Sequence, residues 1–111
     1  KLFRVAESAF RPISAASELE GERPMLLFVG AERCVHCRKL WQLLAHEKLS
    51  QRIAQFETRY LDADLHQELA SDLGVRGLPT LLLITSGQPI SRAPTQYSVA
   101  SLLNWLNSVS L

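Results

Sequence analysis

The sequence predicts an α/β protein with three layers, in which helices cover both faces of a central mixed sheet. The apolar runs Met25–Val29 and Leu81–Ile84 are short and uninterrupted, which is typical of strands buried on both faces. Segments with helical spacing separate and follow these runs, and such alternation favours helices on both sides of a sheet. A Ser-Gly-Gln-Pro turn at 86–89 predicts a terminal hairpin, which makes the sheet mixed rather than purely parallel.

The elements expected in the first half of the chain follow in order. Leu2–Val5 is a short apolar run that predicts an edge strand. Phe10–Leu19 has apolar residues at a period near three, which predicts a short helix that ends at Gly21. Met25–Val29 is the first buried strand. Val35–Ile53 places its apolar residues on one broad helical face, which predicts the longest helix.

In the second half of the chain, the sequence predicts a strand over Gln55–Leu61 and a helix over Leu65–Leu73. A buried strand over Thr80–Thr85, a short edge strand over Ile90–Arg92 and a final helix over Val99–Val109 follow. Gly74 stands where a helix commonly ends in a left-handed residue, so we expect it to close the middle helix. Ser98 precedes the last apolar periodic segment and is the expected N-cap of the final helix.

Composition narrows the possible functions. The chain has 111 residues, which suits one domain over residues 1–111 with a single hydrophobic core. Its 12 Lys and Arg residues and 11 Asp and Glu residues give a net charge of +1, which offers no field to attract nucleic acid or an anionic membrane. The apolar runs are too short to cross a bilayer. We therefore expect a monomer that enters no membrane and acts through a local site.

Two cysteines lie in the motif Cys34-Val35-His36-Cys37, which follows a buried strand and opens the longest predicted helix. Cysteines at this spacing can close into a small disulfide ring with little backbone movement. At a helix N-terminus, unpaired N–H groups and the helix dipole favour a negatively charged sulfur. The thiolate is the nucleophile in disulfide exchange, so Cys34 is the candidate attacking thiol and the deeper Cys37 the candidate resolving thiol.

His36 lies between the cysteines and is the third candidate catalytic residue. An imidazole there can stabilise the Cys34 thiolate, and every ~1.4 kcal/mol of such stabilisation raises the reduction potential by about 30 mV. We therefore expect a more oxidising couple than one with an apolar residue at this position; the alternative is that His36 is an exposed spacer. A metal site is not expected, because zinc needs four ligands and His36 cannot readily join both cysteines on one ion.

A second motif, Gly77-Leu78-Pro79-Thr80, stands immediately before the second buried strand. A proline ahead of a central strand and behind a bulky apolar residue is a candidate cis peptide. In that geometry the backbone N–H and C=O of Leu78 face solvent and can pair with an extended substrate segment, as in β-augmentation. We assign substrate binding to Val35, Leu78 and Pro79.

These two motifs, in this order of strands and helices, resemble the thioredoxin superfamily, and the resemblance covers nearly the whole chain. It implies a thioredoxin-like fold in which Cys34 attacks, Cys37 resolves and Pro79 is the cis-proline that faces the active site. Cys-Val-X-Cys with Gly-Leu-Pro-Thr is more similar to the periplasmic thioredoxin-like domain that ends the transmembrane electron transporter DsbD than to cytosolic thioredoxin. The histidine before the second cysteine is similar to that of the oxidant DsbA. The resemblance implies a bacterial protein of the periplasm or another extracytoplasmic compartment.

The sequence departs from cytosolic thioredoxin around the first motif. The usual Trp before the first cysteine is Arg33, and the aromatic residue at the end of the preceding strand is Gly30. The buried acid of thioredoxin falls at Phe28, and its partner lysine falls at Tyr60. The proton relay that activates the resolving cysteine in thioredoxin is therefore missing. The candidates that remain for that role are His36, Glu32 and water.

The predicted function is that of a thiol–disulfide oxidoreductase that exchanges the Cys34–Cys37 pair with protein thiols and disulfides and has an upstream redox partner protein, without a cofactor. His36 favours a dithiol oxidase or isomerase, whereas the insertion-free chain and the transporter-like motif favour a disulfide reductase or electron relay, which we expect. Two other classes stay open. One is a non-catalytic module that holds extended clients at the Pro79 groove, and the other is a metal-carrying or sensing protein.

Other conspicuous residues are interpreted as structural. Trp41 and Trp105 occur at helical spacing and are expected in the core rather than in a ligand platform. Asp62 and Asp64 look like a pair of catalytic carboxylates, but we expect them to cap the helix that begins near Leu65.

Overall fold

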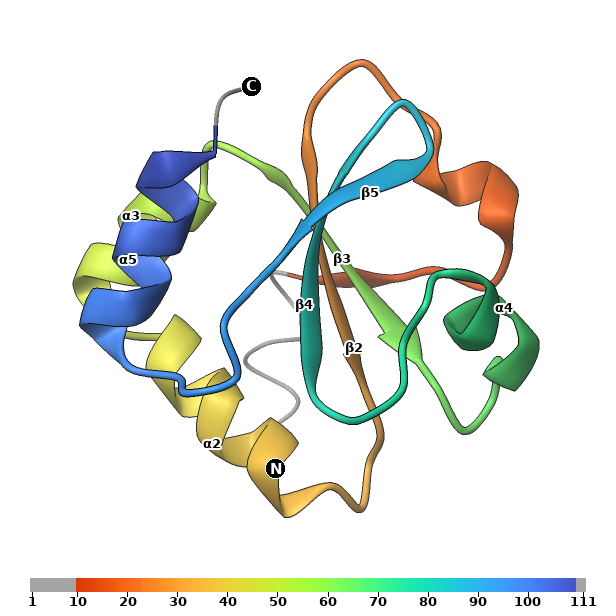
Figure 1. Ribbon diagram of the computed structural model, residues 1–111, viewed down its shortest axis with the longest axis horizontal. Helices are drawn as coiled ribbons and strands as arrows, with labels where there is room; N and C mark the ends of the chain where they lie inside the picture. The colour runs from red at the N-terminus through yellow and green to blue at the C-terminus, as the bar shows by residue number, and fades with distance from the viewer. Residues whose placement is uncertain (1–9, 110–111) are drawn as a thin grey trace.

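The computed structural model describes residues 10–109, which form a five-stranded sheet with the order β1-β3-β2-β4-β5 (Figure 1). The strands are β1 (Arg11–Pro12), β2 (Met25–Gly30), β3 (Glu57–Asp62), β4 (Thr80–Thr85) and β5 (Gln88–Arg92). β1, β3 and β2 run parallel to one another, whereas β4 is antiparallel to both β2 and β5. The predicted α/β class with a central mixed sheet is confirmed.

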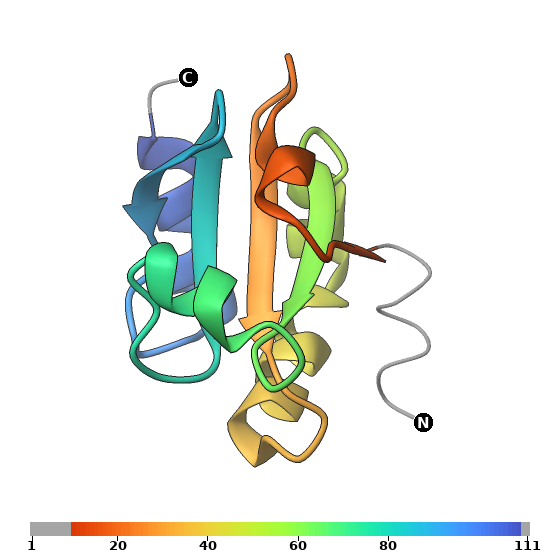
Figure 2. The same ribbon diagram turned by 90° about the vertical axis from the view of Figure 1, so that its right-hand side faces the viewer.

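Helices cover both faces of this sheet. They are the 3₁₀ helix η1 (Ala16–Leu19) and the α-helices α2 (Val35–Leu44), α3 (Glu47–Ile53), α4 (Gln67–Asp72) and α5 (Val99–Ser108). Figure 1 shows α2, α3 and α5 on one side of the sheet and η1 and α4 on the other. Figure 2 looks onto the face that η1 and α4 cover. Each face therefore has its own apolar cluster.

β2 lies at the centre of the sheet and is buried along its whole length. Leu26 and Phe28 belong to the cluster beneath α2, α3 and α5, while Leu27 and Val29 belong to the cluster beneath η1 and α4. This alternation follows from the two-residue period of a strand, and burial on both faces explains why the run is continuously apolar. Packing on both faces holds β2 in place. The position of its last residue, Gly30, is therefore fixed, and the loop that leads to α2 starts there.

The helix predicted over Phe10–Leu19 is wrong: this segment forms the two-residue strand β1 and the short helix η1. The Arg59 side chain donates hydrogen bonds to the backbone oxygens of Arg11 and Pro12, which holds this segment extended beside β3. The helical turn starts later because the Glu18 carboxylate accepts hydrogen bonds from the two backbone N–H groups that precede it, at 14 and 15. The strand predicted over Leu2–Val5 lies outside the described residues.

The single helix predicted over Val35–Ile53 is also wrong, because the segment forms two helices, α2 and α3. The break occurs at His46, whose Nδ1 accepts a hydrogen bond from the backbone N–H of Lys48 at 3.2 Å and so caps α3. After the break, Arg52 on α3 donates to the Asn107 side chain of α5 at 3.0 Å. The two helices therefore keep one apolar face while α3 turns to pack beside α5.

The remaining elements lie close to their predicted ranges. The Ser98 side chain accepts a hydrogen bond from the Ser101 backbone N–H, which confirms the predicted cap of α5. Gly74 has a φ of +80°, the left-handed conformation expected after α4. The predicted capping by Asp62 and Asp64 is wrong, because the N-cap of α4 is His66. Asp62 instead accepts hydrogen bonds from the N–H groups at 64 and 65, in a turn that precedes the helix.

Candidate active site

Cys34 and Cys37 form a disulfide at the start of α2, with their Cα atoms 5.1 Å apart. Cys34 is the N-cap residue, and its Sγ accepts a hydrogen bond from the backbone N–H of Cys37 at 3.1 Å. Cys34 is partly exposed, whereas Cys37 is fully buried. The pair therefore presents one accessible sulfur and one sulfur that is shielded from solvent.

The start of α2 favours negative charge on the accessible sulfur. The first N–H groups of a helix have no partner within the helix, and the helix dipole is positive at this end. The first turn of α2 contains no acidic residue that would compete for these groups. A Cys34 thiolate at the N-cap would keep the N–H of Cys37 as its donor. The position is thus suited to a stabilised, nucleophilic sulfur.

Aromatic rings form the floor of the site beneath the disulfide. Phe28 is completely buried and stacks on Trp41, with ring centroids 3.9 Å apart and an interplanar angle of 5°. Tyr60 lies against both rings, at 5.9 Å from each centroid. Trp41 and Trp105 are both buried, as predicted for core residues. The positions at which cytosolic thioredoxin has its acid and lysine are therefore part of an aromatic cluster.

Gly30 ends β2 directly beside this cluster and the buried sulfur. A Cβ added at Gly30 would lie 2.7 Å from Cε1 of Phe28 and 3.1 Å from Sγ of Cys37. The Phe28 ring cannot move aside easily, because it is stacked between its neighbours. The site therefore requires a residue without a side chain at this position, which explains the glycine at the end of an otherwise apolar strand.

We expect Gly30→Ala to lower the free energy of unfolding of the oxidised protein by about 1–3 kcal/mol, the usual cost of overpacking a filled core. Urea unfolding followed by circular dichroism measures the change. Gly21→Ala is the matched control, because a Cβ at Gly21 meets no atom within 4 Å. Equal stability of the two variants would contradict the proposed contact between residue 30 and the disulfide.

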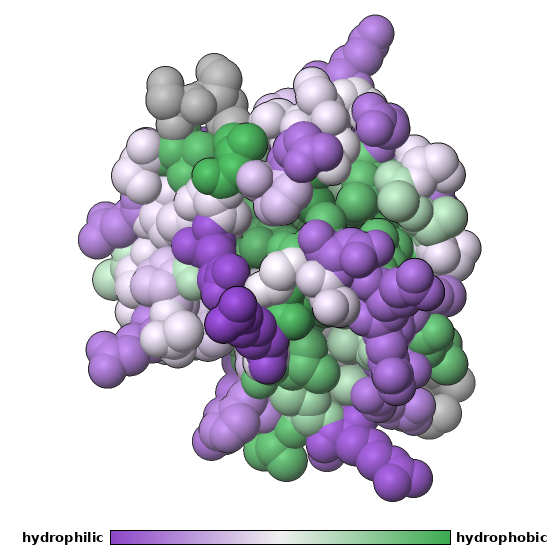
Figure 3. All heavy atoms as spheres, turned by 45° about the vertical axis from the view of Figure 1, so that its right-hand side comes forward, coloured by the Kyte–Doolittle hydropathy of each residue, from purple (hydrophilic) through white to green (hydrophobic). Residues whose placement is uncertain are grey.

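A groove of about 300 Å³ lies next to the disulfide. Its walls come from the start of α2, from the loop before β4 and from the segment after β5, and its lining residues are His36, Gly77, Leu78, Pro79, Thr80, Arg92, Ala93, Thr95 and Tyr97. The lower end of the molecule in Figure 3, where α2 begins, exposes apolar surface between hydrophilic side chains. The groove is therefore a place where an extended segment could lie within reach of Cys34.

The loop before β4 forms the base of the groove. The Leu78–Pro79 peptide bond is cis. Thr80 Oγ1 donates to the Gly77 backbone oxygen at 2.7 Å, and the Tyr97 hydroxyl donates to the Pro79 backbone oxygen at 3.1 Å. Within residues 10–109, no hydrogen bond occupies the backbone N–H or C=O of Leu78. These two groups are available to pair with an extended segment.

The structure brings most of the predicted site residues together. Cys34 and Cys37 are bonded to each other, and His36, Leu78 and Pro79 line the same groove. Val35 is 58% exposed at the first position of α2, beside the groove rather than in its lining. The sequence did not predict the opposite wall, formed by Arg92, Thr95 and Tyr97. Only the aromatic ring of Tyr97, isolated in a polar stretch, gave a signal there.

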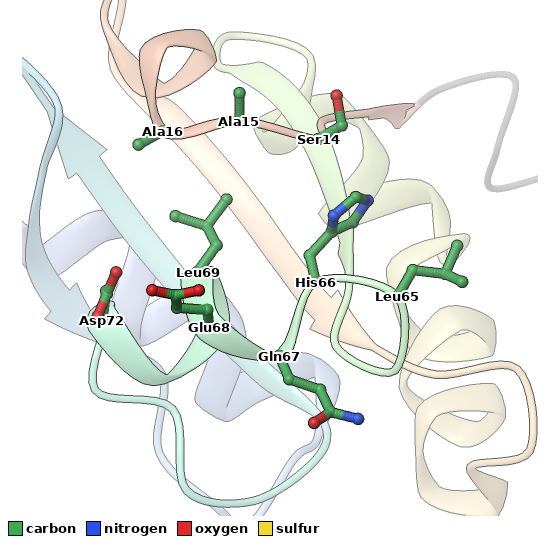
Figure 4. Close-up of a pocket in the computed structure, with 9 residues that line it drawn as sticks. All are labelled: Ser14, Ala15, Ala16, Leu65, His66, Gln67, Glu68, Leu69 and Asp72. Carbon is green, nitrogen blue, oxygen red and sulfur yellow. The ribbon is translucent and has the colours of Figure 1, made fainter.

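A second hollow, of about 390 Å³, lies on the far side of the sheet between η1 and α4. Figure 4 shows His66 and Leu69 directed toward Ser14 and Ala15, with Gln67 pointing away. Over residues 10–109, no three His, Cys, Asp or Glu side chains are grouped so as to bind a metal ion. None of the helices in that range has both the length and the apolar composition needed to cross a membrane. The disulfide groove is therefore the feature with recognisable chemistry.

Comparisons with known proteins point to the same chemistry. A family model described as thioredoxin matches residues 5–108. Thioredoxin from Mycobacterium tuberculosis (strain ATCC 25618 / H37Rv) is 29% identical over 106 residues, which cover 96% of this chain and 87% of that protein. Protein disulfide-isomerase 1 from Caenorhabditis elegans is 31% identical over 98 residues, which cover 83% of this chain and 19% of that protein.

Among solved structures, oxidised mitochondrial thioredoxin 3 from Saccharomyces cerevisiae is similar to this chain with a TM-score of 0.76. The sequence identity is 18%, and the match covers 94% of this chain and 99% of that one. At this identity the similarity concerns the fold. The arrangement of strands and helices described above is therefore that of a known architecture.

Proposed function

The chain belongs to the thioredoxin family of thiol–disulfide oxidoreductases, and we propose that it acts as a protein disulfide reductase or electron relay. The observation that carries this proposal is the asymmetry of the cysteine pair. Cys34 is partly exposed at a helix N-terminus that has no acid in its first turn, and Cys37 is buried behind it. An accessible nucleophile with a shielded neighbour is the arrangement that disulfide exchange requires.

In the reducing direction the Cys34 thiolate attacks one sulfur of a substrate disulfide, forms a mixed disulfide and releases the other substrate sulfur as a thiolate. Cys37 then loses its proton and attacks the Cys34 sulfur, which releases the second substrate thiolate and leaves the Cys34–Cys37 disulfide. Two electrons pass to the substrate, whose thiolates take up two protons. An upstream dithiol protein restores the reduced pair by the reverse sequence of exchanges.

The proton of Cys37 leaves toward solvent in this scheme. The floor beneath Cys37 is built from Phe28 and its aromatic neighbours, which cannot accept a proton. The acceptor is accordingly on the open side of the pair, where His36, Glu32 and water are available. In cytosolic thioredoxin a buried acid removes the proton of the resolving cysteine. In this chain the proton of Cys37 would instead be removed from the solvent side.

The substrate segment is proposed to pair with the backbone N–H and C=O of Leu78, as a short added strand. Pro79 and the exposed side chain of Val35 would contact the residues on either side of the reacting cysteine. Backbone pairing gives affinity with little dependence on sequence. The partners of this site are therefore protein thiols and disulfides in extended segments.

Trapping with Cys37→Ser tests the proposed function. Without the second sulfur, a substrate captured on Cys34 stays bound as a mixed disulfide, which non-reducing electrophoresis separates and mass spectrometry identifies. We expect captured proteins that carry disulfides and one dithiol donor. Capture of dithiol substrates alone would favour an oxidase or isomerase. Non-covalent affinity for extended clients that persists in a Cys34→Ser, Cys37→Ser variant would favour a non-catalytic client-binding module.

His36 is proposed to tune the couple, because its imidazole lies next to the exchanging sulfurs in sequence and lines the groove. We expect His36→Ala to lower the reduction potential by tens of millivolts, on the order of 30 mV for each ~1.4 kcal/mol of thiolate stabilisation lost. Titration of the dithiol against glutathione buffers measures the potential. His66→Ala, at the start of α4, is the matched control. An unchanged or raised potential in His36→Ala would refute the tuning role.

We further propose that the exchange takes place outside the bacterial cytoplasm. The support is the similarity of the Cys-Val-X-Cys and Gly-Leu-Pro-Thr motifs to the periplasmic thioredoxin-like domain of DsbD. Labelling of intact cells with a thiol reagent that cannot cross the inner membrane tests the location. Labelling of Cys34 only after lysis of that membrane would contradict it.

A further inference from the structure

The groove beside the disulfide has a positive wall. Arg92 and His36 are the residues with basic side chains in its lining, and no Asp or Glu is among the described residues that line it. The adjoining loops add the exposed Arg33 and Arg76 against one exposed acid, Glu32. This local excess contrasts with the near balance of charge over the whole chain, whose net charge is +1.

Arg92 lines this groove and has no acidic partner within residues 10–109. Its guanidinium donates to the Gly74 backbone oxygen at 3.5 Å, so it reaches from β5 toward the loop before β4. Burial raises the pKa of Tyr97, and the Arg92 guanidinium acts in the opposite direction, which places the Arg92 charge near that phenol. Arg11 and Arg59, by contrast, form ion pairs with Glu57, whereas no ion pair within residues 10–109 involves Arg92.

We propose that this groove selects protein disulfides in which acidic residues flank the reacting cysteine, and that Arg92 is the residue that recognises their carboxylates. The inference rests on the proposed function, because the groove receives substrate only if Cys34 exchanges with an extended segment paired to Leu78. The side chains that flank the substrate cysteine would then lie in the groove that Arg92 lines. A carboxylate there finds a guanidinium that forms no ion pair within residues 10–109, whereas a lysine or arginine meets a like charge.

Three disulfide-linked fluorogenic peptides that differ only in the two residues flanking the cysteine, Glu, Gln or Lys, test the proposal. For the reduced protein at low salt we expect kcat/KM to fall in the order Glu, Gln, Lys. The ratio between the Glu and Lys peptides should be about fivefold, the order expected from partly exposed ion pairs. The ratio should shrink toward one as the salt concentration rises, because salt screens exposed charges.

Arg92→Gln should bring the Glu to Lys ratio to within about twofold, and Arg92→Lys should restore part of it. Arg23→Gln is the matched control, since it removes an exposed charge just before the start of β2, while the disulfide follows the other end of that strand. It should keep the full ratio. Equal ratios in the unaltered protein and in Arg92→Gln, with all peptides reduced, would overturn this inference and leave the proposed function intact. Failure to reduce any peptide would overturn both.

Discussion

Cys34→Ser is expected to lower kcat/KM for disulfide reduction by about a thousandfold or more. The attacking species is a thiolate, and a serine hydroxyl at the same position is not ionised near neutral pH and forms no stable bond to sulfur. Reduction of a fluorogenic disulfide peptide in the presence of a dithiol donor measures the loss. The substitution is close in size and lies at a partly exposed N-cap, where serine is a preferred residue, so the fold should persist.

Cys37→Ser separates the two steps and is the matched variant. Cys34 keeps its position and its accessibility, so the reduced variant should form a mixed disulfide in a single turnover and then stop. Rapid quenching with acid, followed by mass spectrometry, detects the adduct on Cys34. The assignment of roles would be reversed if Cys34→Ser formed the adduct while Cys37→Ser did not. Such a result would require the buried sulfur to be the nucleophile.

The chemistry of the site could be predicted from sequence because it depends on local order. Cys34 and Cys37 lie one helical turn apart at a strand–helix junction, and their accessible and shielded positions follow from that spacing. Pro79 precedes a buried strand, and its loop lies within the same groove. Short motifs of this kind fix their own geometry, so the fold was predicted correctly and the predicted cysteines and Pro79 lie close together, while their roles stay predictions.

The groove's second wall could not be predicted in the same way. Arg92 and Tyr97 reach the site only because the β4–β5 hairpin folds back along the sheet, which is a tertiary arrangement without a local signal. The break at His46 was missed for a related reason. Its side chain caps α3 by a backbone contact two residues away, and the apolar spacing continues across it. The spacing of apolar residues indicates which face of a helix is buried, but it does not indicate where one helix ends and the next begins.

Phe28→Ala is expected to lower the free energy of unfolding by about 3–5 kcal/mol, the range for removing a large aromatic side chain from a filled core. Phe28 has no exposed surface and lies in the central strand, stacked on Trp41 and in contact with Tyr60. Since small domains are stable by about 5–15 kcal/mol, the variant would lose a large part of its stability. Urea unfolding of the oxidised protein, followed by circular dichroism, measures the change.

Two further variants, Leu65→Ala and Phe28→Leu, show whether the expected loss in the free energy of unfolding comes from removing the aromatic ring beneath the disulfide. Leu65 is 75% exposed, so its truncation should change stability by less than about 0.5 kcal/mol. Phe28→Leu keeps part of the buried volume and should be intermediate. If Phe28→Ala were as stable as Leu65→Ala, the rings would not support the disulfide. A large loss would instead show that apolar packing of Phe28 on Trp41 holds β2 and α2 together beneath Cys37.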